Sequence, residues 1–276
     1  MKYKIIVDSS SNLQNDYLKS LNIDNISFGT VPLSINTQNK LFLDNDDLNL
    51  SELFKNIKKY KSSTACPSPQ DYLNQFCGAD YYIVITIAQK LSGSYNSACM
   101  AKELYENPDN IFVLDSRLTA GALELLVNKS IELIKENKRF FDIRKELSKY
   151  CEDLHVLFIL QNYDNLIKNG RLNKFVGMIA KAFHIVPVMY GYDGEIKIKD
   201  KCRTIKNAIE ALVNDIGKIK DIENKKIIIS HSEAVILANK IKDKILNKYK
   251  PSEIIIRENR GLCGYYCMPG GIIVSF

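Results

Sequence analysis

A hydroxyl-rich turn made of Ser92, Gly93 and Ser94 follows a continuous apolar, β-branched run over Tyr81–Ile87. Such a run is typical of a strand buried on both faces in a parallel sheet, and from Tyr95 the apolar spacing becomes helical. Ligands of open α/β sheets bind beyond the carboxyl ends of the strands, where helix N-termini present unpaired N–H groups and partial positive charge. The turn is therefore predicted to bind an anion. The alternative is that one of its serines only caps the helix.

The other side chains that could do chemistry are scattered along the chain. The three histidines, His155, His184 and His231, are isolated in sequence, so neither a catalytic triad nor a metal site is visible in their spacing. Cys263 and Cys267 are close in sequence, but no further Cys or His cluster is near them, and no metal site is predicted. The seven cysteines are odd in number and dispersed, which favours free thiols in a reducing cytoplasm over a disulfide framework.

The composition is typical of a globular protein, with 46% hydrophobic and 25% charged residues, and 276 residues suit one large domain or two ordinary ones. The net charge of +6 is spread along predicted helices, and no aromatic-interleaved basic motif supports nucleic-acid binding. The first residues, MKYKIIV, predict a strand rather than a secretory signal, and no stretch reaches the apolar length of a membrane span. We expect a cytoplasmic protein without stable membrane insertion, which leaves transient membrane contact open.

The elements that must position the turn alternate between strands and helices in the first half of the chain. Residues 61–69 are too rich in Pro and Ser to form an element. The predicted strands are Tyr3–Val7, Ile26–Ile35, Lys40–Leu43, Tyr81–Ile87 and Ile111–Leu114, the second paired with the third, and the predicted helices are residues 12–21, Leu48–Tyr60, Gln70–Cys77, a helix from Tyr95 and Ala120–Glu136. This alternation implies a parallel sheet with helices on both faces.

A second α/β unit is predicted to start after Tyr150, with the domain boundary between residues 150 and 160. Gly170 is a C′ signal for a helix around Tyr163–Asn169. The predicted strands are His155–Leu160, Ile185–Tyr190, Glu195–Lys199, Lys226–Ser230, Glu253–Arg257 and Gly271–Phe276, and the further helices are Lys174–Ala182, Thr204–Lys218 and Glu233–Tyr249. The chain is therefore divided into an N-terminal α/β domain, residues 1–155, and a C-terminal α/β domain, residues 156–276.

A set of short motifs, in a fixed order over nearly the whole chain, resembles the DegV family. The motifs are IIVDSSSNL at the start, STACPSP at 63–69, LSGSYNSA at 91–98, VLDS at 113–116, LIKNGRL at 166–172, YDGEI at 192–196, CRT at 202–204 and MPGG at 268–271. The resemblance implies a two-domain α/β protein, with a mixed sheet in the second domain, that holds one long-chain fatty acid between its domains. Some members are the acyl-binding subunit of a bacterial fatty acid kinase, whose separate ATP-binding subunit phosphorylates the bound carboxylate. No cofactor is implied.

The resemblance also implies which residues hold the carboxylate. Thr64 matches the Thr of a TSQP-like loop, and Ser92 matches the first Ser of an SGTY-like turn, in which Ser94 replaces the usual Thr. Neutral hydroxyls and backbone N–H groups can hold a singly charged carboxylate without a buried cation. The implied supporting residues of the pocket are Gly93, Ser94, Tyr266 and Gly270, and the residues implied near the pocket mouth or facing a kinase are Arg171 and Arg203.

Two differences from the family pattern matter for the charge near the implied site. Tyr266 stands where the family commonly has His, and Val186 stands where it often has Lys before the proline matched by Pro187. Both differences remove positive charge near the implied site, so we expect fatty acid binding but poor phosphoryl transfer with a generic kinase.

Two other function classes remain as alternatives. One is a Ser-dependent hydrolase that uses Ser92 with His231 as the base, although the chain contains no G-x-S-x-G motif. The other is a DNA-associated factor, for which the sequence offers no recognition element.

Overall fold

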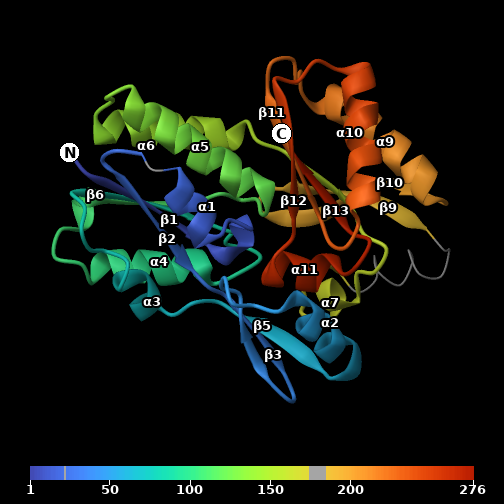
Figure 1. The fold of residues 1–276 in the computed structure, drawn as a ribbon, viewed down its shortest axis with the longest axis horizontal. Helices are drawn as coiled ribbons and strands as arrows, with labels where there is room; N and C mark the ends of the chain where they lie inside the picture. Colours follow the sequence, from blue (N-terminus) through green and yellow to red (C-terminus); the bar gives the residue numbers. More distant parts are fainter. Residues whose placement is uncertain (22, 174–184) are drawn as a thin grey trace.

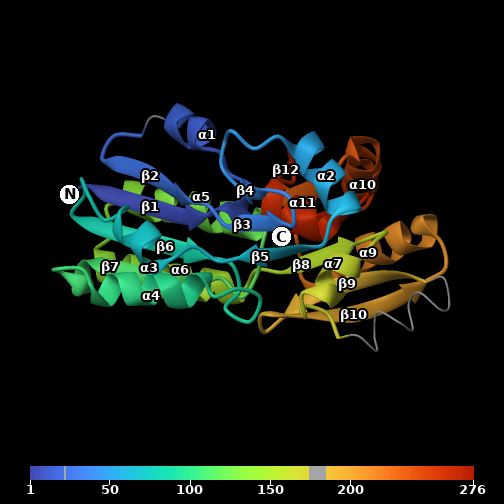
Figure 2. The ribbon, with the colours of Figure 1, turned by 90° about the horizontal axis from the view of Figure 1, so that it is seen from below.

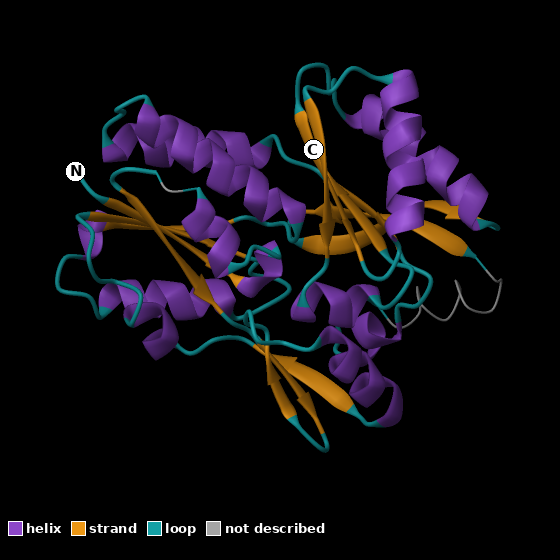
Figure 3. Cartoon of the chain, in the orientation of Figure 1, coloured by secondary structure: helices purple, strands orange, loops and turns teal. Residues whose placement is uncertain are grey.

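The computed structural model describes residues 1–21, 23–173 and 185–276. The helix predicted over Lys174–Ala182 lies outside the described residues. Three sheets and the helices that cover them make up the described fold (Figures 1 and 3). The predicted α/β class, with a parallel sheet followed by a mixed sheet, is confirmed.

The first sheet is four-stranded and entirely parallel, in the order β2-β1-β6-β7. Its strands are β1 (Tyr3–Asp8), β2 (Ile26–Val31), β6 (Tyr81–Thr86) and β7 (Ile111–Asp115). The chain proceeds outward from β1 to β2 and then returns to the other side of β1 with β6. The carboxyl ends of β1 and β6 therefore form a topological switch point, where open α/β sheets place their ligands.

Helices cover both faces of this sheet, as predicted. Ile6 and Val84 share a buried cluster with residues of the two helices on one face, whereas Ile5 and Ile85 belong to the cluster on the opposite face, because successive strand residues alternate in direction. The helices of the first face are α3 (Pro69–Leu73) and α4 (Ser94–Glu103), and those of the second are α1 (Asn15–Ser20), α5 (Gly121–Lys135) and α6 (Phe140–Glu152) (Figure 1).

The second sheet is six-stranded and mixed, in the order β10-β9-β8-β13-β11-β12. Only β11 and β12 are parallel, and the C-terminal strand β13 lies between β8 and β11. The strands are β8 (Val156–Ile159), β9 (Val186–Tyr192), β10 (Glu195–Cys202), β11 (Lys226–His231), β12 (Glu253–Glu258) and β13 (Ile272–Ser275). Helices α9 (Ile205–Ile219) and α10 (Val235–Lys248) cover one of its faces.

A small antiparallel sheet, in the order β4-β3-β5, completes the fold beside the other two (Figure 2). Its strands are β3 (Ser34–Thr37), β4 (Leu41–Leu43) and β5 (Ser62–Ala65). Helix α2 (Leu50–Lys59) and the C-terminal helix α11 (Gly261–Cys267) pack in one apolar cluster with it. The remaining short elements are α7 (Asp164–Lys168) and the 3-10 turns η1 (Ser9–Ser11) and η2 (Pro108–Asn110).

Helix α5 connects the first two sheets because it packs against both. A Cβ atom added at Gly121, the first residue of α5, would lie 2.6 Å from Cγ2 of Ile228 in β11, so only glycine fits there. One turn later, the buried carboxylate of Glu124 accepts hydrogen bonds from Nε and Nη2 of Arg257 in β12 at 3.0 and 2.7 Å. The division into two domains at residue 155 stays a prediction, since one buried cluster contains residues from both sides of it.

Two predictions about elements were wrong, and two helices were not predicted. The run Ile26–Ile35 is two strands, since the chain turns at Pro32 from the parallel sheet into the β3–β4 hairpin. The segment 61–69 contains β5, an edge strand whose Ser and Thr pair with β3. Helices α6 and α11 were not predicted, and the two glycines and two cysteines of α11 carry no helical signal.

Candidate ligand-binding site

A cavity of about 280 Å³ lies among the three sheets, close to the lower limit of about 300 Å³ for ligand sites. Its floor is the face of the six-stranded sheet that α9 and α10 do not cover, where Val156, Phe158 and Leu160 point into it at alternate positions along and just beyond β8. Ile273 of β13 and Ile196 of β10 extend this surface. The other apolar lining residues are Leu33, Ala65, Ile87, Leu91, Leu118, Leu166 and Leu262. The walls are therefore suited to an alkyl chain.

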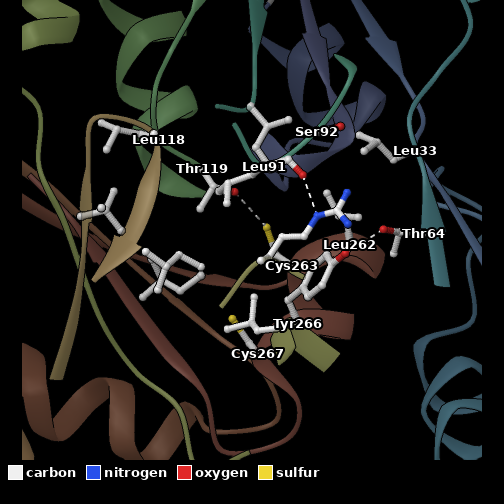
Figure 4. A pocket seen from close by; sticks show the side chains of 18 of the residues that line it. Leu33, Thr64, Leu91, Ser92, Leu118, Thr119, Leu262, Cys263, Tyr266 and Cys267 are labelled. Carbon is white, nitrogen blue, oxygen red and sulfur yellow. Dashed lines mark hydrogen bonds between the residues drawn. The ribbon is translucent and has the colours of Figure 1, made fainter. Parts of the chain in front are cut away.

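One end of this cavity is polar. Thr64, Ser92 and Tyr266 lie there (Figure 4), and Arg171, from a fourth part of the chain, lines the cavity close to Tyr266. The Thr64 Oγ1 and Tyr266 hydroxyl oxygens are 2.7 Å apart and share one hydrogen bond. Arg171 donates from Nε to the Leu91 carbonyl at 2.9 Å. Since the two hydroxyls of Thr64 and Tyr266 carry two hydrogens and use one between them, the second can be donated to a ligand.

Strand β5 directs Thr64 toward this end of the cavity. Thr64 lies opposite Ile35 on the same face of the β3–β5 pair, and Ile35 is fully buried in the cluster that contains Tyr265 of α11. The Tyr265 hydroxyl also donates to the Ser62 carbonyl at 3.0 Å. This contact holds β5 against α11, so that Thr64 meets Tyr266, the next residue of the helix.

The Ser92 turn is held by the carboxylate of Asp8, at the switch point between β1 and β6. Asp8 is fully buried and accepts hydrogen bonds from Ser94 Oγ at 2.7 Å and from the Ile87 backbone N–H at 2.8 Å. Burial raises the pKa of Asp8, and these hydrogen bonds together with those from Ser10 oppose the shift. The carboxylate thus occupies the place of an anion at the switch point and leaves the neighbouring Ser92 facing the cavity.

The side chain of Ser92 does not cap helix α4. The N-cap residue is Gly93, and no side chain caps the helix. Ser92 Oγ accepts from the Ser94 N–H at 3.3 Å, and no described residue accepts its hydroxyl hydrogen. A Cβ at Gly93 would lie 2.9 Å from Cys66 Sγ, so glycine permits the segment after β5 to approach the turn. The capping alternative is therefore wrong for Ser92, and its hydroxyl is a free donor.

Tyr266 presents a neutral hydroxyl to the polar end. Burial raises the pKa of the Tyr266 phenol, while the hydrogen bond with Thr64 and the positive charge of Arg171 act in the opposite direction. Tyr266 is thus a hydrogen-bond donor at neutral pH. The guanidinium of Arg171 supplies positive charge beside it.

The helix that carries Tyr266 begins on a second buried carboxylate. Asp44 accepts the backbone N–H groups of Gly261 and Leu262 at 2.7 and 2.8 Å, at the N-terminus of α11. Burial raises the pKa of Asp44 to about 6, because desolvation outweighs these hydrogen bonds and the charge of Arg260. This interaction connects the loop after β4 to α11.

Three of the predicted site residues lie away from the cavity. The Ser94 hydroxyl points to Asp8 and to Tyr72 OH, 2.6 Å away. Gly270 has φ of +92° and contacts Gln161. Arg203 is exposed just before α9. The predicted Thr64, Ser92, Gly93, Tyr266 and Arg171 all line the cavity.

Two further residues named in the sequence hypotheses are also elsewhere. Val186 packs on the helix-covered face of the six-stranded sheet, opposite to the cavity, so the absence of Lys there does not change the charge around the site. The His231 ring accepts the Ala234 N–H at Nδ1 and is not among the described lining residues. It therefore cannot act as a base for Ser92 in this conformation.

Asp8 and Asp44 were not recognised from the sequence as residues that organise the site. Asp8 directly follows the apolar run Tyr3–Val7, and Asp44 directly follows Lys40–Leu43. Their position at the end of a predicted strand was the sequence signal that could have identified them. Within the described residues, no group of His, Cys, Asp and Glu side chains could hold a metal ion. None of the described helices is both long enough and apolar enough to cross a membrane.

Comparisons with known proteins cover the whole chain. A model of the DegV family, described as uncharacterised, matches residues 2–276. A DegV domain-containing protein of Streptococcus gordonii is 37% identical over 284 residues, which are 100% of this chain and 99% of the relative.

Two solved structures of comparable length share this fold. The Streptococcus pneumoniae fatty acid kinase B3 protein, loaded with linoleic acid, has a TM-score of 0.93 at 31% identity, over 100% of this chain and 99% of that one. A DegV family protein of Ruminococcus gnavus, refined with vaccenic acid, has a TM-score of 0.89 at 29% identity, again over 100% and 99%.

Proposed function

Because the chain belongs to the DegV family, we propose that it binds one long-chain fatty acid in the cavity described above. The carboxylate is held by Thr64 and Ser92, and the acyl chain extends over the floor formed by β8. The observation that carries this proposal is an apolar cavity at one end of which free hydroxyl donors lie beside the guanidinium of Arg171. Related proteins that were solved with linoleic and vaccenic acid support it.

The acyl chain supplies most of the binding free energy. About fifteen buried methylenes at ~0.8 kcal/mol each give a gross ~12 kcal/mol. Each hydrogen bond to the carboxylate adds only about 1–3 kcal/mol. The polar end therefore selects and orients the head group, while the apolar walls determine the affinity.

Replacing Ser92 by alanine is expected to weaken palmitate binding by about 1–3 kcal/mol, because one donor to the carboxylate is lost. The affinity for methyl palmitate, which carries no charged head group, is expected to decrease less. Isothermal titration of the delipidated variant with both ligands measures the difference.

The matched control is Ser130→Ala. The Ser130 hydroxyl is buried in α5 and donates to the Leu126 carbonyl at 2.8 Å, away from the cavity. It is expected to leave the affinity for both ligands unchanged. Equal losses for acid and ester in Ser92→Ala would mean that Ser92 does not hold the carboxylate.

In the cell, we propose that the protein is a carrier of the acid or presents it to an ATP-binding kinase subunit, rather than acting as an enzyme by itself. The name of the pneumococcal neighbour supports a kinase partnership. Tyr266 and Arg171 are the side chains whose charge is proposed to bear on the carboxylate. A neutral phenol at Tyr266 cannot become a cation, as the family's imidazole can.

Replacing Tyr266 by histidine is therefore expected to increase acyl phosphate formation with a heterologous kinase subunit by roughly tenfold, or about 1.4 kcal/mol of transition-state stabilisation. Acyl phosphate is measured at equal lipid occupancy. Tyr266→Phe, which adds no charge, is the control and is expected to give no increase. Fast turnover of the unmodified protein that drops in Tyr266→His would contradict the argument.

The Ser-dependent hydrolase is not supported by the geometry. A serine nucleophile needs a base within hydrogen-bonding distance. Among the described residues, no histidine or carboxylate is hydrogen-bonded to the Ser92 hydroxyl.

A further inference from the structure

Leu118 and Gly191 face each other on the side of the cavity that lies opposite to the carboxylate site. Leu118 lies across the cavity from Thr64 (Figure 4). Gly191, in β9, belongs to the same cavity-lining sheet face as Ile196, its partner in β10. A Cβ added at Gly191 would lie 3.3 Å from Cδ2 of Leu118, and this is its single close neighbour. The leucine side chain therefore packs on bare backbone.

Glycine at this position is not required by the backbone. The φ of Gly191 lies outside the left-handed region, in contrast to that of Gly194 in the adjacent turn. A larger residue could adopt the same conformation. Its side chain would enter the space between β9 and Leu118 and would reduce the volume of the cavity.

Both sides of the contact are fixed. Leu118 is almost fully buried, and its backbone N–H and carbonyl both bind the Ser116 hydroxyl, at 3.1 and 3.0 Å. Gly191 is held in the β9–β10 ladder opposite Ile196, and at the exposed turn that follows, Lys90 Nζ lies 2.8 Å from Asp193 Oδ2. Because Leu118 and Gly191 are both held in place, their contact resists a longer ligand more strongly than a mobile contact would.

The cavity lining becomes charged next to the Leu118–Gly191 contact. Arg117 and Glu195, the neighbours in sequence of Leu118 and Ile196, also line the cavity, and both are exposed. A methyl end that passed between Leu118 and Gly191 would leave apolar surroundings and meet charged, hydrated groups. An additional methylene would then no longer be buried.

We propose that the Leu118–Gly191 contact is the stop that sets the longest acyl chain this protein binds with full burial. The inference rests on the proposed fatty acid binding and adds its chain-length specificity. Within the limit, affinity increases about fourfold per added methylene, the equivalent of ~0.8 kcal/mol. For acids longer than this limit, the affinity no longer increases with each added methylene.

The test is the dissociation constant for straight-chain saturated acids from lauric to behenic acid, measured on the delipidated protein. The unmodified protein is expected to show the fourfold steps up to one chain length and none beyond it. Leu118→Ala is expected to move this break to acids longer by about two carbons, and Gly191→Val to shorter acids. The milder pair, Leu118→Val and Gly191→Ala, is expected to shift the break in the same two directions.

The control is Leu33→Ala, which makes the same truncation at the opposite, polar end of the cavity. It is expected to weaken all acids alike and leave the break in place. Circular dichroism and melting temperature establish that each variant is folded. A break at the same length in all folded variants would overturn the chain-length assignment while leaving fatty acid binding intact. Failure of the unmodified protein to bind any of the acids would overturn the proposed function itself.

Discussion

Replacing Arg257 by alanine is expected to lower the unfolding free energy by about 3–5 kcal/mol, because it leaves the carboxylate of Glu124 buried without its partner. The Glu124 side chain is 1% exposed and receives two parallel hydrogen bonds from the guanidinium. The guanidinium carbon of Arg257 also lies 4.5 Å from the centre of the Tyr17 ring. This group therefore connects α5, α1 and the six-stranded sheet.

The control for burial is Arg139→Ala. Arg139 binds Asp142 with the same two guanidinium nitrogens, but its side chain is 83% exposed. Exposed pairs contribute at most about 1 kcal/mol. Urea unfolding measures both variants. In the double variant Arg257→Ala with Glu124→Gln, part of the loss is expected to be recovered because no buried charge remains. Equal small effects of Arg257→Ala and Arg139→Ala would show that Glu124 is hydrated.

The second large effect is a dependence of stability on pH that originates at Asp44. Its pKa is about 6 in the folded chain against an ordinary 3.8, so the folded state holds this proton more tightly than the unfolded state. Between these values the folded state binds more protons, and the unfolding free energy must fall as the pH rises. The shift corresponds to about 3 kcal/mol, all of it lost above pH ~6.

Asp44→Asn removes this titration and keeps an acceptor at the N-terminus of α11. The unfolding free energy of the unmodified protein minus that of Asp44→Asn is therefore expected to fall by about 3 kcal/mol from pH ~4 to pH ~7. Asp44→Ala, which removes the acceptor of two backbone N–H groups, is expected to be less stable than Asp44→Asn at every pH. A difference between the protein and Asp44→Asn that is constant with pH, or that rises, would contradict the assignment.

The parts of the fold that could be predicted are those with a strong local pattern. The run Tyr81–Ile87 has the apolar content of a doubly buried strand, and β6 forms there. Strand β5 could not be predicted in this way, because it is a short polar edge strand held by Tyr265, about two hundred residues away in sequence. Helix α11 is likewise stabilised from outside, by Asp44.

Local sequence patterns identified only part of the candidate site as well. Ser92 was found from its position after a strand, but Thr64 and Tyr266 were found only through the family resemblance. Ser94 was placed in the pocket because hydroxyl type and spacing do not reveal direction, and its hydroxyl turns instead to Asp8. Val186 was misplaced for a related reason, since a shift of one residue along a strand moves a side chain to the other face.

The central claim is that one long-chain fatty acid occupies the cavity. Native mass spectrometry of the protein as purified, followed by extraction with organic solvent and analysis of the lipid, tests it most directly. The account predicts one fatty acid per chain, and it predicts that returning palmitate to the delipidated protein raises the melting temperature, since a tight ligand stabilises the folded state. A mass without lipid in repeated preparations, together with no rise in melting temperature on adding palmitate, would contradict it.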